Sequence, residues 1–132
     1  MDEKTDSPPS RTGRRILCIE DEHFIGELYT RALKNAGYDV TVVLDGVRGL
    51  EAAMTDNYDI ILLDIMIPNM LGIEVLNRLR REKPNLKAKI IITTNLDQTK
   101  ERRKEIERQA DGYIVKAEIT PKQLVEFLED IA

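Results

Sequence analysis

Polar side chains able to handle a phosphoryl group stand at the ends of short apolar runs in this sequence. Glu20 and Asp21 follow one run, Asp64 follows another, Thr94 closes a third and Lys116 follows a fourth. Acidic groups brought together in a partly buried cleft repel one another, and a hard divalent cation is a common solution. Mg²⁺ fits best, because it accepts one or two carboxylates, keeps several waters and leaves a position for a phosphate oxygen.

Each of these side chains has a chemical role in such a reaction. Asp64, with its charge partly neutralised, can attack a phosphoryl donor through a loose transition state. Lys116 would pair with the phosphoryl oxygens as a point charge, and the Thr94 hydroxyl would donate a hydrogen bond to another oxygen. Simpler interpretations stay open, because acids favour the first turn of a helix and Thr93 competes with Thr94 for the hydroxyl role.

The elements that must position these residues are β-branched strands alternating with amphipathic helices. Strands are expected at residues 14–19, 39–43, 59–63, 89–93 and 112–115.

The helices between the strands have clear start and stop signals. The first stops before Gly37, the second begins near the N-cap Asp45, and the third covers residues 73–81. The last begins with a capping box of Thr120 and Gln123, with Pro121 in its first turn and Ile119 placed to pack on Leu124. The residues expected to face inward are Phe24, Ile25, Leu28, Tyr29, Leu33 and Ala36 in the first helix, Val47, Leu50 and Met54 in the second, Val75, Leu76 and Leu79 in the third, and Leu124, Val125, Leu128 and Ile131 in the last.

Strict alternation of strands and helices predicts an α/β domain with a parallel sheet between two helix layers. We expect a doubly wound fold of five parallel strands, and the family resemblance given below implies the flavodoxin-like strand order 2-1-3-4-5. In such folds ligands bind outside the carboxyl ends of the strands, where the polar residues above are found.

Four sequence motifs occur in one order along the chain, namely ILCIEDE, DIILLDIMIPNMLG, IIITTNL and GYIVK. Together they resemble the receiver domain of bacterial two-component response regulators, of the stand-alone type, over residues 14–132. The intervals between Asp64, Thr94 and Lys116 are those expected of that family. The resemblance implies a phosphorylation site at Asp64, a metal site made by Glu20, Asp21, Asp64 and the main-chain carbonyl of Met66, catalytic roles for Thr94 and Lys116, switch residues Thr94 and Tyr113, Pro68 in the loop after the site, and Gly72 at the start of the next helix.

The resemblance also implies partners and a signalling role. A sensor histidine kinase or a phosphotransfer protein would supply the phosphoryl group, and a downstream protein would read it from the fourth helix, fifth strand and fifth helix. The same face can form a homodimer. Such a module is not a conventional enzyme, although it catalyses its own phosphorylation and dephosphorylation.

Two residues depart from the family pattern. Receivers usually follow the lysine with a cis proline, whereas this chain has Ala117, so we expect a trans peptide between Lys116 and Ala117. The small residue usual after the switch hydroxyl is Asn95. Neither change removes a group that phosphorylation needs.

Other functions stay open from the sequence alone. The Ala117 substitution leaves room for a silent receiver-like module, and Tyr113 also fits plain half-buried strand packing. A phosphohydrolase would need a second acid two residues after Asp64, where Met66 stands. A flavin-binding protein would need a phosphate loop rich in small residues after the first strand, and EDEHFIG is not one.

Composition limits the classes of partner. The 132 residues contain 20 Lys and Arg against 24 Asp and Glu, so no general attraction to nucleic acid or to membrane is expected. Residues 1–13 are expected to be a disordered polar tail, and 14–132 the receiver domain. The single cysteine, Cys18, lies in an apolar run, so we expect it to be a buried, reduced side chain of a cytoplasmic protein. His23 is expected to be a surface residue.

The fourth helix, expected between Gln98 and Gln109, is unusual in having Ile106 as its one large apolar residue. An exposed ion pair stabilises a helix far less than a buried leucine or isoleucine does. We therefore expect this helix to be the least firmly packed, and its excess of cations to suit an acidic partner.

Overall fold

The structure is a computed structural model that describes residues 14–21 and 23–131, with the main chain only of residues 23–26. The expected tail at residues 1–13, the His23 side chain and the stripe residues Phe24 and Ile25 therefore lie outside what is described.

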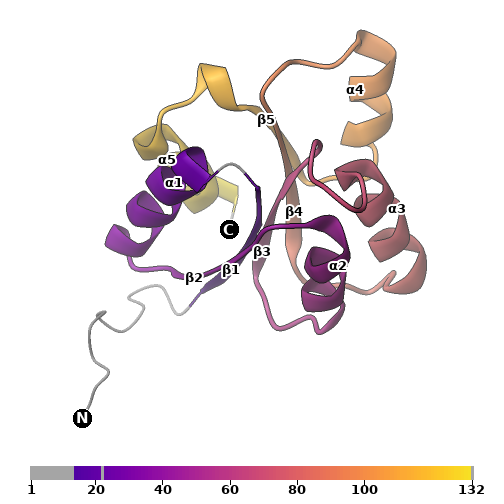
Figure 1. The fold of residues 1–132 in the computed structure, drawn as a ribbon, viewed down its shortest axis with the longest axis horizontal. Helices are drawn as coiled ribbons and strands as arrows, with labels where there is room; N and C mark the ends of the chain where they lie inside the picture. Colours follow the sequence, from indigo (N-terminus) through magenta and orange to yellow (C-terminus); the bar gives the residue numbers. More distant parts are fainter. Residues whose placement is uncertain (1–13, 22, 132) are drawn as a thin grey trace.

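Five parallel strands form one sheet in the order β2-β1-β3-β4-β5, as predicted (Figure 1). β3 is the middle strand of the sheet and β1 is its neighbour, and the polar residues of interest lie at their carboxyl ends. The strands are β1 (Arg15–Ile19), β2 (Asp39–Val43), β3 (Ile60–Asp64), β4 (Lys89–Thr94) and β5 (Gly112–Val115).

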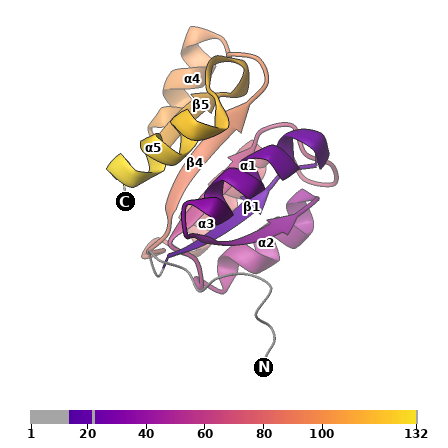
Figure 2. The ribbon, with the colours of Figure 1, turned by 90° about the vertical axis from the view of Figure 1, so that its left-hand side faces the viewer.

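The helices cover both faces of this sheet, as a doubly wound fold requires. α1 and α5 lie on one face, and α2, α3 and α4 on the other (Figures 1 and 2). The helices are α1 (His23–Asn35), α2 (Gly46–Met54), α3 (Gly72–Glu82), α4 (Lys100–Glu107) and α5 (Pro121–Ile131), and a short 3₁₀ turn, η1 (Lys116–Glu118), follows β5.

Two apolar layers hold the sandwich together, one on each face of the sheet. Alternate residues of β3 supply both, since Ile61 and Leu63 pack towards α2 and α3 while Ile60 and Leu62 pack towards α1 and α5. All four are at most 2% exposed. Burying each such side chain contributes about 1.5–3 kcal/mol, so the strand that ends in Asp64 is firmly fixed.

The predicted helix signals act as expected. The main-chain N–H of Thr120 donates to Gln123 Oε1 over 2.9 Å, and the Gln123 N–H donates to Thr120 Oγ1 over 3.1 Å, which completes the capping box. Asp45 caps α2 by accepting from the Arg48 N–H at 2.8 Å. Gly37 ends α1 with φ of 100°, a conformation that side chains disfavour.

The prediction that Leu28 and Val47 face inward is wrong. Leu28 is 38% exposed and Val47 is 41% exposed. α1 contacts the edge strand β2 and α5, and α2 contacts β1 and α3, so in each helix the buried part is narrower than the apolar stripe. α2 buries Leu50, as predicted, together with Gly46, Gly49 and Ala53.

Element boundaries differ from the prediction by a residue. β1 starts at Arg15 and not at Arg14, β3 covers Ile60–Asp64, and β4 extends to Thr94. The larger difference is η1, which the sequence did not predict. It begins at Lys116, and no described peptide bond is cis, so the bond before Ala117 is trans as expected.

Among the described residues, none of the helices is long and apolar enough to cross a membrane.

Candidate functional site

Three of the predicted residues meet at the carboxyl ends of the strands. Ile19 and Leu63 are register partners, so the residues that follow them, Glu20 and Asp64, lie side by side. Lys116 follows β5 and reaches across to both, donating from Nζ to Asp64 Oδ2 over 2.9 Å and to Glu20 Oε1. Each of the three residues is at most 5% exposed, so the cluster is buried.

A third carboxylate completes an acidic group that can hold a metal ion. One oxygen each from Glu20, Asp21 and Asp64 can be chosen so that all lie within 4.8 Å of one another. Carboxylate oxygens at this spacing are ligands that Mg²⁺ accepts, with waters filling the remaining positions. The predicted carboxylates therefore fit the predicted metal.

The buried cluster is short of positive charge, since one ammonium group faces two buried carboxylates. Burial and the nearby charge of Asp64 raise the pKa of Glu20 to about 7, although contact with Lys116 opposes the rise. The pKa of Lys116 is also raised: burial lowers it, but the hydrogen bonds and charges of Glu20 and Asp64 outweigh burial. The lysine therefore stays charged, and Glu20 holds its proton to a higher pH than an exposed glutamate does.

The loop from β3 to α3 folds back over Asp64. The N–H of Met66 donates to Asp64 Oδ1 over 3.0 Å, so each carboxylate oxygen has a hydrogen-bond donor. Gly72 closes the loop by donating its N–H to Ile65 O over 2.9 Å. An added Cβ on Gly72 would lie 2.3 Å from Asp64 O, so glycine is required at this crossing.

Thr94 ends β4 beside this cluster, but its hydroxyl is engaged with the following loop. Thr94 Oγ1 donates to Leu96 O over 2.8 Å, and the residue is 1% exposed. Its neighbour Thr93 is the register partner of Asp64. The predicted hydroxyl donor is thus near the site, with its proton directed to the β4–α4 loop.

The Tyr113 side chain points away from Glu20, Asp21 and Asp64 and towards the β4–α4 loop. Its hydroxyl donates to Asp97 Oδ1 over 2.9 Å and accepts from the Gln98 N–H over 3.0 Å. The Arg103 guanidinium lies 4.4 Å from the ring centroid and pairs with Asp97 at 3.2 Å. We call Asp97, Arg103 and Tyr113 the tyrosine clasp.

The tyrosine clasp and the crossing of Gly72 over Asp64 were only partly visible in the sequence. Glycine at position 72 was noted, but nothing in the sequence connects Asp97 or Arg103 with Tyr113. The contact joins a loop, a helix and a strand that are separate in sequence, and periodicity within one element carries no such information.

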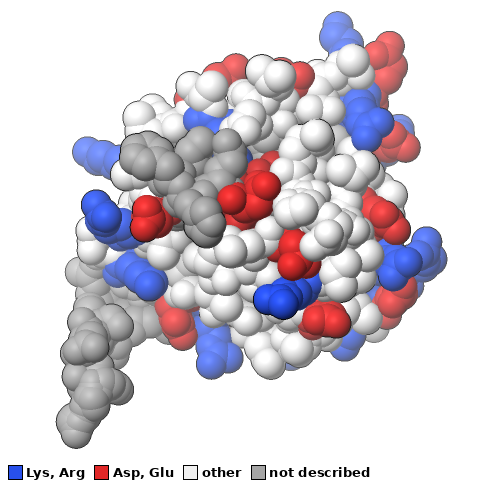
Figure 3. All heavy atoms as spheres, viewed as in Figure 1, with Lys and Arg blue, Asp and Glu red and all other residues white. Residues whose placement is uncertain are grey.

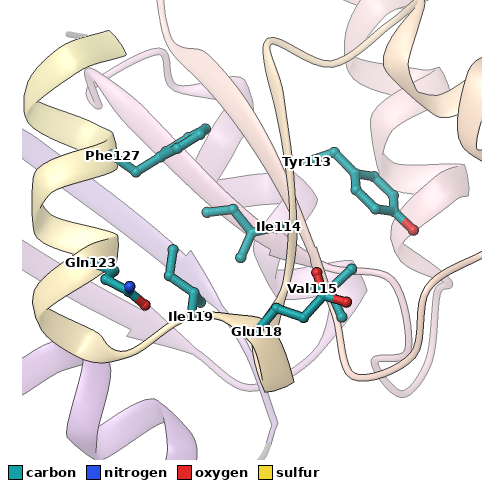
Figure 4. A pocket seen from close by; sticks show the side chains of 7 residues that line it. All are labelled: Tyr113, Ile114, Val115, Glu118, Ile119, Gln123 and Phe127. Atoms are coloured by element: carbon teal, nitrogen blue, oxygen red, sulfur yellow. The ribbon is translucent and has the colours of Figure 1, made fainter.

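A pocket of about 360 Å³ lies beside β5 (Figure 4). Its lining residues are Tyr113, Ile114, Val115, Glu118, Ile119, Gln123 and Phe127. In Figure 4 the Tyr113 ring points away from α5, towards α4.

The outer surface of α4, at the upper right of Figure 1, has cationic and anionic side chains close together, as Figure 3 shows.

Comparison with known proteins agrees with this arrangement. A family model described as the response regulator receiver domain matches residues 16–129. Response regulator ArlR of Staphylococcus saprophyticus is 38% identical over 102 residues, or 77% of this chain and 45% of that protein. CusR of Escherichia coli, a transcriptional regulatory protein, is also 38% identical, over 77% of this chain and 44% of its own. The chain thus spans about half the length of these curated relatives.

Solved structures with the same fold include two receiver domains. The receiver domain of the Francisella response regulator 1452 superposes with a TM-score of 0.79 at 28% identity, covering 90% of this chain and 96% of that one. A CheY-like receiver from Methanospirillum hungatei superposes with a TM-score of 0.77 at 26% identity, covering 89% and 91%.

Proposed function

Because the chain belongs to the response regulator receiver domain family, we propose that it is a phosphoacceptor switch whose acceptor is Asp64. The observation that carries the assignment is the environment of that residue. Asp64 is a buried carboxylate at the end of a central strand, and it is bonded to Lys116 and close to Glu20 and Asp21. Glu20 has the same lysine and carboxylate neighbours, but Asp64 lies at the end of the middle strand and its other oxygen accepts from the Met66 N–H, and the family resemblance makes Asp64 the acceptor and Glu20 a metal ligand.

The reaction is a transfer of a phosphoryl group between two nucleophiles. One carboxylate oxygen of Asp64 attacks the phosphorus atom of a phosphohistidine as the P–N bond breaks. The bonding electron pair stays on the imidazole nitrogen, and Asp64 becomes a mixed anhydride of a carboxylic and a phosphoric acid. A bound Mg²⁺ supplies positive charge for the phosphoryl oxygens during this transfer.

The remaining side chains stabilise the incoming charge. Lys116 already donates to Asp64 Oδ2, so it is placed to donate to a phosphoryl oxygen attached there. Thr94 can supply a second donor when its hydroxyl turns from Leu96 O to the phosphoryl group. That exchange removes one donor from Leu96 O, which also accepts from Gln98 Nε2 over 3.2 Å, and through this loop the change reaches Gln98 and the tyrosine clasp.

We assign the donor and the reader of the signal to different surfaces. Met66, Leu71 and Leu96 are 65%, 51% and 77% exposed on the loops beside Asp64, and exposed apolar groups suit a docking protein. The proposed donor is a sensor histidine kinase or a phosphotransfer protein. The proposed readout surface for a downstream protein, or for a second copy, is α4, β5 and α5 with the pocket beside Tyr113.

The wider assignments are also proposals. A receiver domain over residues 14–132 after a tail at 1–13 fits the family match, which lies at 16–129. Self-catalysed phosphorylation and dephosphorylation, and a cytoplasmic location, are what a receiver with this site would be expected to have.

Incubation with acetyl phosphate and Mg²⁺ tests the assignment directly. Wild-type protein should gain the mass of one phosphoryl group, and peptide mapping should place it on Asp64. Asp64→Asn should gain none, because an amide is a poor nucleophile, while Asp39→Asn, at the opposite end of the sheet, should label normally. Full labelling of Asp64→Asn, or labelling independent of Mg²⁺, would refute the proposal.

A further inference from the structure

The loop between β3 and α3 must hold its shape for Asp64 to work. It carries Met66, whose N–H donates to Asp64 Oδ1 and whose carbonyl is an expected metal ligand. The loop is tied to the sheet at its two ends, by the Ile65 N–H donating to Thr93 O and by the Gly72 N–H donating to Ile65 O. Ile67 is a further anchor, because it is 4% exposed and packs in the apolar layer under α2 and α3, and residues 68–70 follow it.

The middle of the loop is held from outside, by the first residue of α2. Gly46 donates its N–H to Pro68 O over 3.0 Å. The first N–H groups of a helix have no partner within the helix, so Gly46 satisfies its own N–H by this bond. The loop in turn gains an anchor on an element that is itself capped by Asp45.

The approach at Gly46 is too close for any other residue. An added Cβ would lie 2.1 Å from Met70 O and 2.9 Å from both the carbonyl carbon and the Cβ of Met70. Two of those three atoms are main chain, so no change of side-chain rotamer relieves the contact. Asn69, between Pro68 and Met70, has φ of 71°, a left-handed conformation that asparagine adopts more readily than most residues other than glycine.

We propose that Gly46 is a positioning residue for the phosphorylation site: it sets the path of residues 68–70 and so the place of Met66 beside Asp64. This inference rests on the proposed function, since it describes how the chain maintains the same site. Gly46 itself would touch neither the phosphoryl group nor the metal.

Gly46→Ala and Gly49→Ala make a matched pair that separates positioning from stability. Both lie on the buried face of α2, but the three atoms nearest a Cβ on Gly49 all belong to the Ile19 side chain, at 2.7–3.0 Å, whereas two of the three nearest a Cβ on Gly46 are main chain. Gly46→Ala should speed amide exchange at residues 66–71 in metal-free protein and weaken Mg²⁺ binding, measured by calorimetry, about tenfold or more. Gly49→Ala should lower the melting temperature yet bind Mg²⁺ nearly as tightly as wild type.

A second pair covers the case in which Gly46→Ala does not fold. Asp45→Ala removes the cap that holds the start of α2, whereas Asp45→Asn keeps a capping side chain and loses the same charge. Only Asp45→Ala should speed exchange at residues 66–71 and weaken Mg²⁺ binding. Met70→Ala in the Gly46→Ala background should restore nothing, because the main-chain contact remains.

The outcomes distinguish this inference from the proposed function. Wild-type protein that binds no Mg²⁺ and takes no phosphoryl group refutes the function. Wild-type protein that does both, with equal Mg²⁺ affinity and equal loop exchange in Gly46→Ala and Gly49→Ala, or in Asp45→Ala and Asp45→Asn, refutes the role of Gly46 alone.

Discussion

Lys116 lies between two buried carboxylates and neutralises part of their charge. It donates to Asp64 and to Glu20, and all three residues are shielded from water. An isolated buried carboxylate is costly, so the lysine stabilises the site when no other cation is present. The same lysine then competes with any metal for the carboxylate oxygens.

Replacing Lys116 by methionine should therefore change stability and metal affinity in opposite directions. Lys116→Met is expected to lower the free energy of unfolding near pH 8 by about 3 kcal/mol, the lower end of the range for a broken buried pair, because Glu20 can take up a proton. It should bind Mg²⁺ more tightly and accept phosphate from acetyl phosphate more slowly. Urea unfolding and calorimetry measure both effects, with the exposed Lys122→Met as control. Weaker Mg²⁺ binding in Lys116→Met would contradict the competition.

Glu20 should make the stability of the metal-free protein depend on pH. Its pKa of about 7 in the folded protein lies above the ordinary value of 4.5, so the folded state keeps a proton that the unfolded state has lost. The contribution of this proton to the free energy of unfolding is fully present below pH 4.5 and is lost as the pH rises through about 7. Above that pH it changes no further. Its size is on the order of 3 kcal/mol or less.

The control for this pH dependence is Glu20→Gln, which cannot titrate. Both proteins are unfolded chemically in a metal chelator, from acid to mildly alkaline pH. The free energy of unfolding of the wild-type protein, relative to that of Glu20→Gln, should fall as the pH rises through about 7 and Glu20 ionises. Parallel curves for the two proteins would show that Glu20 has an ordinary pKa.

At the scale of elements, α4 is held differently from the other helices. It buries one large side chain, Ile106 at 2% exposure, and is anchored at its start by Thr99, whose Oγ1 accepts from the Arg102 N–H over 3.3 Å. Arg103 adds the tyrosine clasp and a contact with Glu107 at 3.6 Å. These polar contacts are exposed, so they stabilise α4 less than an apolar stripe would.

Amides from Lys100 to Arg108 should therefore exchange with solvent faster than those of the other four helices. Phosphorylation or partner binding should slow them, because ordering of the β4–α4 loop would reach α4 through the tyrosine clasp. Hydrogen exchange measured by mass spectrometry or NMR tests this. Ile106→Val should speed exchange in α4 while α1 is unchanged. Protection of α4 equal to that of α1 in the free, unphosphorylated monomer would contradict the expectation.

At the scale of the whole molecule, Cys18 reports on the integrity of the sheet. It lies in β1 between β2 and β3 and is 3% exposed. Burial, with Glu20 and Asp64 adding to it and Lys116 opposing, raises the pKa of the thiol to about 12. Thiolate is the reactive form, so the folded protein presents almost no nucleophile.

Reaction of Cys18 with a disulfide reagent such as DTNB should consequently require global unfolding. Its rate should rise with urea in parallel with the unfolded fraction, because opening of a surface loop does not expose β1. A Cys18→Ala, Asp130→Cys protein, with its thiol on the exposed end of α5, should react at once in native buffer. Fast labelling of wild-type protein without urea would show that β1 opens locally.

The sequence by itself determined the fold and which side chains meet at the candidate site, while their functional roles stay predictions. Short apolar runs ending in Glu20, Asp64 and Thr94, alternating with helical periods, require a parallel sheet, and parallel strands present their carboxyl ends at one edge. That rule alone brings the acids, the hydroxyl and Lys116 together. Helix caps such as Asp45 and Thr120 could be predicted because each cap bonds to a residue within one turn of the same helix.

Only the tertiary structure decided how these groups bond to one another. The contact of Lys116 with Glu20, the turn of Tyr113 towards Asp97, and the approach of Gly46 to the loop at Pro68 and Met70 all join elements distant in sequence. Periodicity shows which side of an element is apolar. The angle and depth at which neighbouring elements pack depend on the complementary shapes of both, and those shapes exist only once the chain has folded.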